Sequence, residues 1–163
     1  MDQNSDNNKQ FFDPKNFKTI IVGIGNKNSD STDLIHQLID TGHKGTHEEA
    51  LRRIKKESNA LELLVSAIKE KEFEENRNAL IAACWESGID CRPELQFFVD
   101  LAIKENYLCC IEATSVIDGM DMPVDQDQLK RAISGLHLAL KKPVNDKSEL
   151  LKQLDALLHS FVE

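Results

Sequence analysis

Two stretches of the chain, Arg77-Asn-Ala-Leu-Ile-Ala-Ala-Cys-Trp-Glu-Ser-Gly88 and Tyr107-Leu-Cys-Cys-Ile-Glu-Ala-Thr-Ser-Val-Ile-Asp-Gly119, decide the fold class. In both stretches, small and aliphatic residues recur every three or four positions, which is the spacing of one face of an α-helix. Each stretch ends in a glycine, the residue that most often follows the last turn of a helix. The two stretches therefore predict helices that end at Gly88 and Gly119.

The same periodicity continues in both directions from these stretches. The helix that opens at Pro93 and the helix from Tyr107 to Ile117 are apolar nearly all round, which predicts that they form the buried centre of the domain. Other amphipathic patterns, with Gly, Pro, Asn and Ser between them, predict further helices over residues 34–41, 47–57, 59–71, 74–87, 129–140 and 147–162. Residues 47–57 and 59–71 can also be read as one long helix. We therefore expect an all-α protein of up to nine short helices joined by short loops.

An overlay of the chain on itself predicts a repeat. Gly88 falls on Gly119 at an offset of 31 residues, and the same offset places Leu80 on Ile111 and Trp85 on Val116. Apolar positions thus meet apolar positions, with a glycine at the end of both helices. Short helices joined tightly in pairs are typical of α-solenoids.

The two quoted stretches resemble the first helices of HEAT-like repeats, and the resemblance to this HEAT-like and armadillo-type family covers residues 46–141. The 31-residue period is similar to the short HEAT-like units of bilin-lyase-type proteins, whereas most HEAT repeats have about 40 residues. The resemblance implies a right-handed α-α superhelix whose second helices line the concave face. A compact multi-helix bundle is the alternative.

The N-terminal region is harder to interpret. Residues 1–10 are rich in Asn, Asp and Gln and predict a disordered tail, so we expect a single all-helical domain over residues 11–163. Within it, residues 18–25 allow either a helix, which Asp13 and Pro14 would begin, or a strand. The strand reading suggests a nucleotide loop, but Asn28 stands where the third glycine of G-x-G-x-x-G would be.

The charge of the chain excludes several function classes. The 163 residues carry a net charge of −8, which argues against binding to nucleic acid or to anionic membranes. No apolar run is long enough for a membrane span, and residues 1–10 do not look like a signal peptide, so we expect a cytoplasmic protein. Residues 73–119 contain 3 basic and 9 acidic side chains, and we expect this acidic surface to attract a basic partner protein or peptide.

Four cysteines, Cys84, Cys91, Cys109 and Cys110, are expected to be reduced. Their spacing does not match the paired spacing of zinc ligands, and three of them lie in apolar helical stretches, which predicts core packing. Cys91 precedes Arg92 and Pro93 at a predicted helix start, where a thiol pKa can be lowered. A simple helix-boundary role is the alternative for Cys91.

Two polar stripes with helical spacing predict the functional surface. They lie on the presumed second helices and would line one side of a solenoid. The predicted partner-binding residues are Asn59, Glu62 and Ser66 on the first stripe, where Lys69 follows, and Gln96, Asp100 and Lys104 on the second. We therefore expect a non-enzymatic scaffold or adaptor that binds a protein partner along its second-helix face.

The sequence offers little for catalysis, and we expect no cofactor and no bound metal. The alternatives are a HEAT-like enzyme of bilin-lyase type, with Asp100 or Glu112 as its acid, and a helical bundle that responds to a ligand or a metal. The second alternative would use Cys91 or the H-x3-H pair of His43 and His47. The sequence leaves the oligomeric state open, and it predicts that His36, His137 and His159 are solvated on helix flanks.

Overall fold

The computed structural model describes residues 30–40, 42–142 and 146–162. Its contacts divide the chain into two units, residues 1–33 and residues 34–163, and the second unit contains α2 and all the helices that follow it. The described residues contain helices and no strands, which confirms the all-α prediction. The predicted tail over residues 1–10 and the disputed residues 18–25 lie outside the described residues.

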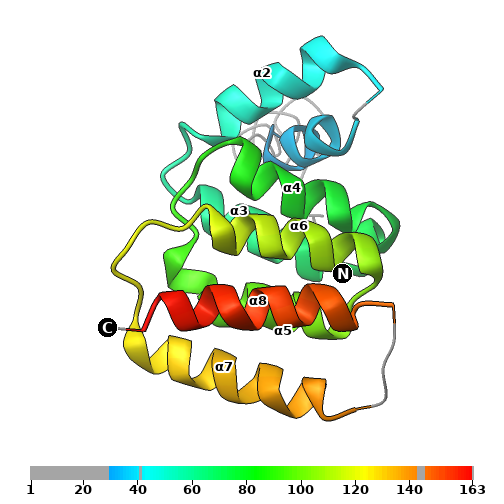
Figure 1. The fold of residues 1–163 in the computed structure, drawn as a ribbon. Helices are drawn as coiled ribbons and strands as arrows, with labels where there is room; N and C mark the ends of the chain where they lie inside the picture. Colours follow the sequence, from blue (N-terminus) through cyan, green and yellow to red (C-terminus); the bar gives the residue numbers. More distant parts are fainter. Residues whose placement is uncertain (1–29, 41, 143–145, 163) are drawn as a thin grey trace, which may run out of the picture. The chain divides into compact units, whose positions relative to one another are not determined.

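The second unit is helical at residues 34–39 and then forms α2 and a series of further helices (Figure 1). The α-helices are α2 (Lys44–Ile54), α3 (Ala60–Lys69), α4 (Arg77–Glu86), α5 (Leu95–Lys104), α6 (Tyr107–Asp118), α7 (Gln126–Leu140) and α8 (Ser148–Ser160). Two 3-10 helices, η1 (Lys71–Asn76) and η2 (Arg92–Glu94), precede α4 and α5.

Local sequence signals explain several of the helix ends. Gly88 follows α4 with a φ of +64°, a left-handed conformation that glycine adopts without steric cost. Asn106 begins α6, where its side chain accepts a hydrogen bond from the Cys109 amide at 3.0 Å. Asp125 caps α7 in the same way, with 2.7 Å to the Gln128 amide. The predicted end of the helix at Gly88 is therefore confirmed.

Helices α5 and α6 are the centre of the second unit. Helix α6 packs against α4, α5 and α8, whereas α5 packs against α6 and α7; Figure 1 shows α4, α6 and α8 running roughly parallel. Phe98 on α5 and Ile117 on α6 have no exposed surface. The prediction that these two apolar helices form the buried centre is confirmed.

A buried network of charged groups joins the ends of α3 and α5. The Arg77 Nε donates to the carbonyl oxygen of Ile68 at 2.9 Å, and its Nη1 lies 2.8 Å from the Glu105 carboxylate. Lys147, which is 7% exposed, donates to three carbonyl oxygens at the carboxyl end of α5, those of Ala102, Ile103 and Glu105. Because the last carbonyls of a helix have no partners within it, both cations stabilise helix ends.

Trp85 and its counterpart in the 31-residue overlay have different environments. The side chain is 44% exposed, whereas Val116, its counterpart in the 31-residue overlay, is 2% exposed. The same overlay also pairs the fully buried Leu80 with the half-buried Ile111. Trp85 follows an apolar pattern but lies on the outer edge of α4, where its indole can reach both a partner and water.

The described helices are too short or too polar to cross a lipid bilayer. None of them combines the length and the apolar character that crossing a membrane requires.

Candidate partner-binding site

An open groove of about 440 Å³ runs along α3. We call it the α3 groove. Its polar edges and apolar floor are formed by Ser58, Asn59, Leu61, Glu62, Val65, Ser66, Lys69 and Glu94. All three residues predicted on the first stripe, Asn59, Glu62 and Ser66, therefore line one continuous surface.

The α3 groove joins α3 to the start of α5. Glu94 comes from η2, immediately before α5, and the Lys69 ammonium lies 4.9 Å from the centre of the Phe97 ring. A cation over an aromatic ring is held by the electrostatic quadrupole of the ring. Lys69 thus bridges the two helices at one end of the groove, whereas Val65 is 5% exposed and forms part of its floor.

The second predicted stripe does not line the α3 groove. On α5, the Gln96 amide donates to Asp100 at 2.9 Å, and Lys104 donates to the same carboxylate at 2.7 Å. The Gln96 backbone amide meets the Gln128 side chain of α7 at 3.5 Å, and Gln128 also donates to the Pro93 carbonyl at 3.1 Å. A row of hydrogen-bonded side chains therefore runs along α5 through Gln96, Asp100 and Lys104. Gln96, at the start of the row, contacts α7.

The acidic residues of the segment 73–119 are spread over several surfaces. Each of the three basic residues in the segment pairs with an acid of the same segment: Arg77 with Glu105, Arg92 with Asp90, and Lys104 with Asp100, at 2.7–2.8 Å. The acids that remain are Glu74, Glu75, Glu86, Glu94, Glu112 and Asp118. Among them, Glu94 alone lines the α3 groove.

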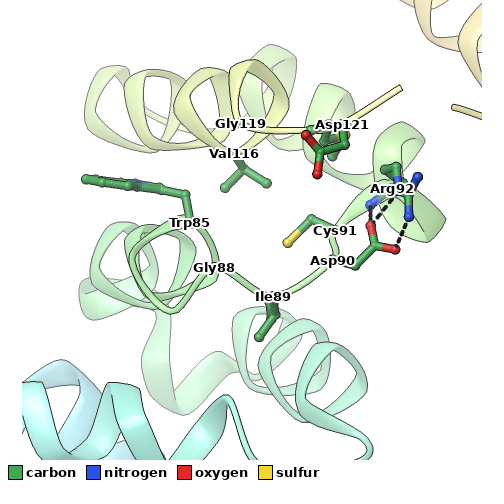
Figure 2. A pocket seen from close by; sticks show the side chains of 10 residues that line it. Trp85, Gly88, Ile89, Asp90, Cys91, Arg92, Val116, Gly119 and Asp121 are labelled. Carbon is green, nitrogen blue, oxygen red and sulfur yellow. Dashed lines mark hydrogen bonds and ion pairs between the residues drawn. The ribbon is translucent and has the colours of Figure 1, made fainter. Parts of the chain in front are cut away.

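A second hollow, of about 340 Å³, lies between the carboxyl ends of α4 and α6 (Figure 2). We call it the Trp85 hollow, and its lining includes Trp85, Cys91, Arg92, Val116 and Asp121. Figure 2 shows Arg92 turned towards Asp90, which its guanidinium contacts at 2.7 Å, and away from the Cys91 sulfur. This hydrogen bond lowers the pKa of Asp90 below its ordinary value.

The exposed indole of Trp85 is held in place from α6. Its Nε1 donates to the Glu112 carboxylate at 2.9 Å. In the sequence, Trp85 lies on the apolar pattern of its helix, and Glu112 is considered only as an acid for catalysis. The i, i+27 separation of these two residues gives no sequence signal for their contact, because it depends on how α4 packs on α6.

The cysteines are free and buried, as expected for Cys84, Cys109 and Cys110. A hydrogen bond with the Cys91 thiol and burial together hold the pKa of Cys84 well above its ordinary value. Burial also raises the pKa of Cys109 and of Cys110. Cys91 is 5% exposed and stands at the N-cap of η2, which is the helix-boundary role that the sequence allowed.

The H-x3-H pair of His43 and His47 points to separate partners. The His43 ring lies 2.8 Å from the Asp40 carboxylate, whereas the His47 ring lies 2.9 Å from the Leu38 carbonyl and 3.0 Å from Glu86. Because both ring nitrogens of His47 already have partners, this pair does not form a metal site together with its neighbours. His36 instead meets the edge of the Phe73 ring at 5.4 Å.

Comparisons with known proteins were made over the whole chain. No protein-family model, curated protein or solved structure matches it. The α3 groove and the other surfaces of this chain therefore provide the indications of its function.

Proposed function

We propose that the chain is a non-enzymatic scaffold that binds a partner protein in the α3 groove. The observation that carries this proposal is that Asn59, Glu62 and Ser66 line one open groove with an apolar floor. An apolar floor with polar edges is the usual composition of a surface that buries a partner side chain and orients it by hydrogen bonds. The four free, buried cysteines are consistent with a reducing compartment such as the cytoplasm.

The packing of the helices supports a short α-α superhelix as the architecture. Neighbouring helices pack in pairs, α3 on α4, α5 on α6 and α7 on α8, and helices two places apart also pack, α4 on α6, α5 on α7 and α6 on α8. Contacts between helices one and two places apart in the chain are typical of stacked helix pairs. A compact bundle is the alternative arrangement of the same helices.

The chemistry of the α3 groove favours a partner segment with a basic side chain. Glu62 is exposed on α3 and Glu94 borders the same groove from η2, so a lysine or arginine between them would meet two carboxylates. Leu61 and Val65 offer an apolar contact beneath. The partner of this proposal is therefore a protein with a basic and partly apolar segment.

Site-directed crosslinking tests this proposal in the full chain. A photoreactive residue replaces Ser66 in the groove or Ser134 on α7, which contributes no residue to the groove. We expect one discrete partner crosslinked from Ser66 and not from Ser134, and a loss of at least about fivefold when Glu62→Lys and Glu94→Lys are added. Equal yields from both positions would mean random collision and would overturn the proposal.

A matched variant separates the groove from the total charge. Asp127→Lys with Glu149→Lys changes the net charge by the same amount at two side chains that are 80% and 74% exposed and lie outside the groove. We expect this control to keep at least half of the crosslinking yield, because screened charges far from an interface contribute little. If it loses as much as the groove variant, the α3 groove is not the binding site.

The alternative of a HEAT-like enzyme of bilin-lyase type has less support. Its candidate acids, Asp100 and Glu112, each hold a hydrogen-bonded neighbour, and neither lines the α3 groove or the Trp85 hollow. The ligand-responsive alternative has one observation in its favour, which is that Cys91 lines the Trp85 hollow.

A further inference from the structure

Three potential metal ligands meet where α7 packs on α8. They are His137 on α7 and Asp155 and His159 on α8, and one donor atom from each lies within 4.8 Å of the other two. The Nε2 of His137 is 3.0 Å from the Asp155 Oδ1, and the Nδ1 of His159 is 3.6 Å from the same oxygen. The two imidazole rings are stacked, with their centres 5.6 Å apart.

These separations fit the coordination sphere of zinc. Zinc lies about 2.0–2.1 Å from nitrogen and oxygen ligands, so the ligands of a tetrahedral ion are about 3.3 Å from one another. The 3.0 Å between His137 Nε2 and Asp155 Oδ1 is close to that value, and the side chains of His137 and His159 are 49% and 50% exposed. Half-exposed rings can adjust by a few tenths of an ångström, and they leave a path for an ion from solvent.

The Asp155 carboxylate supplies an independent observation. Its Oδ1 is almost fully buried, and within the described part of the chain it receives no hydrogen bond, despite its distance of 3.0 Å to His137. A buried oxygen without a hydrogen-bond donor calls for an explanation. A carboxylate oxygen and an imidazole nitrogen at this separation share either the hydrogen of an imidazole N–H or a metal ion.

The rest of the local structure fits a metal site. The His159 Nδ1 lies 2.8 Å from the Asp155 backbone oxygen, so this nitrogen is placed to donate its hydrogen there, and Nε2 is the nitrogen that would bind the ion. Contacts of a ligand histidine to a backbone carbonyl orient many metal sites. Two imidazoles and one carboxylate are ligands for zinc and similar transition metals, whereas magnesium and calcium prefer oxygen alone.

From these observations we infer that His137, Asp155 and His159 form a binding site for a divalent transition-metal ion, zinc above all, that links α7 to α8. Three protein ligands leave the fourth tetrahedral position for water or for a donor from a bound molecule. The site lies apart from the α3 groove, and it does not depend on the proposed partner-binding function.

Zinc binding by the tag-free, full-length chain tests the inference. Equilibrium dialysis against zinc alone, with the metal measured by mass spectrometry, gives the stoichiometry and the affinity. We expect one ion per chain and affinities at least about tenfold weaker for His137→Ala, Asp155→Asn and His159→Ala, since each removes one of three ligands. Circular dichroism of each variant without metal shows whether the fold is retained.

His43→Ala is the matched control. It removes a histidine that also pairs with an aspartate, Asp40, at 2.8 Å, but that has no second histidine beside it. We expect its zinc affinity to equal that of the unchanged chain. All variants keep the four cysteines, so zinc bound by thiols would persist in each of them.

A second readout locates the ion directly. Nitrogen NMR shifts of the histidine rings should change for His137 and His159 when zinc is added and stay constant for His36 and His43. Absence of zinc binding, or binding that survives His137→Ala combined with His159→Ala, would overturn the inference. In that result the proton between His137 and Asp155 would be the full explanation of the cluster.

Discussion

Two polar clusters of the second unit use similar residue types in opposite ways. In the network of Arg77, Glu105 and Lys147, each cation donates to backbone carbonyls or to a carboxylate, at most 3.0 Å away. In the cluster of His137 and Asp155 with His159, the central oxygen is buried but accepts no hydrogen bond from the described residues. The cations of the first network have their hydrogen-bond acceptors, whereas the second cluster would gain its central cation when the proposed metal ion binds.

The difference in hydrogen bonding between the two clusters separates polar groups that stabilise the fold from polar groups that could bind a ligand. Lys147 is 7% exposed and fills the orphan carbonyl positions at the end of α5, so its role is explained by the fold alone. His137 and His159 are about half-exposed, and nothing in the packing of α7 on α8 requires them. Whether a polar group has its hydrogen-bond partners therefore indicates its role in this molecule better than its charge does.

The largest expected effect comes from the complete network. Lys147→Met keeps the length of the side chain but leaves three carbonyl oxygens, one buried and two partly buried, without this donor, which should lower the free energy of unfolding by about 3 kcal/mol. Urea unfolding measures the loss. Lys152→Met is the control, because its side chain is 65% exposed and pairs with the exposed Glu149, and it should change the stability by less than about 0.5 kcal/mol. A loss below about 1 kcal/mol for Lys147→Met would contradict this structural role.

A slightly smaller effect is expected from filling the incomplete cluster. If zinc binds to the folded state only, a free concentration 100 times the dissociation constant should raise the free energy of unfolding by about 2.7 kcal/mol. The gain should appear in thermal or urea unfolding and disappear with EDTA. His137→Ala should abolish the gain, whereas Lys147→Met should retain it, because Lys147 is not a ligand. An equal gain in His137→Ala would place the stabilising ion elsewhere.

The sequence predicts the helical parts of this molecule better than the contacts between them. The patterns that end at Gly88 and open at Pro93 identify α4 and α5, because helix periodicity and glycine or proline signals are local. Asn59, Glu62 and Ser66 fall on one face of α3 for the same reason, so half of the predicted partner-binding residues do line one groove.

The features that sequence reasoning missed all depend on packing between helices. Gln96 faces α7, and Trp85 contacts Glu112 on α6, so neither environment follows from the pattern of its own helix. The cluster on α7 and α8 had one local signal, since Asp155 and His159 have the i, i+4 spacing that puts two ligands on one face. The third ligand, His137, is 18 residues away from Asp155 and becomes adjacent only when α7 and α8 pack.

Buried thiols give a third class of polar group, whose effect appears at alkaline pH. The pKa of Cys84 is raised by the Cys91 hydrogen bond and by burial, so the folded state keeps its proton at a pH at which the unfolded chain, with a thiol pKa of about 8.5, has lost it. Stability from this thiol is complete below that pH and falls above it, by at most about 1.4 kcal/mol per pH unit.

Cys84→Ala isolates the contribution of this thiol. The substitution leaves a cavity whose cost does not depend on pH, but it removes the titrating group. We therefore expect the loss of stability between pH 8 and pH 10 to be smaller in Cys84→Ala than in the unchanged chain, as measured by urea unfolding at both pH values. Equal losses would mean that Cys84 does not titrate differently in the folded and unfolded states.

The smallest expected effect decides what kind of cluster His137 and Asp155 form. Asp155→Asn in zinc-free buffer should change the free energy of unfolding by less than about 0.5 kcal/mol, because the partner ring of His137 is 49% exposed and its solvent-screened contact contributes little. Glu105→Gln is the matched change in the complete network and should cost more, about 1.5 kcal/mol, since Glu105 binds the mostly buried Arg77 guanidinium at 2.8 Å. A cost for Asp155→Asn as large as that for Glu105→Gln would mean that both clusters hold the fold together. If Asp155→Asn loses zinc binding but leaves the free energy of unfolding without zinc nearly unchanged, the role of Asp155 between the two histidines is to bind the metal ion.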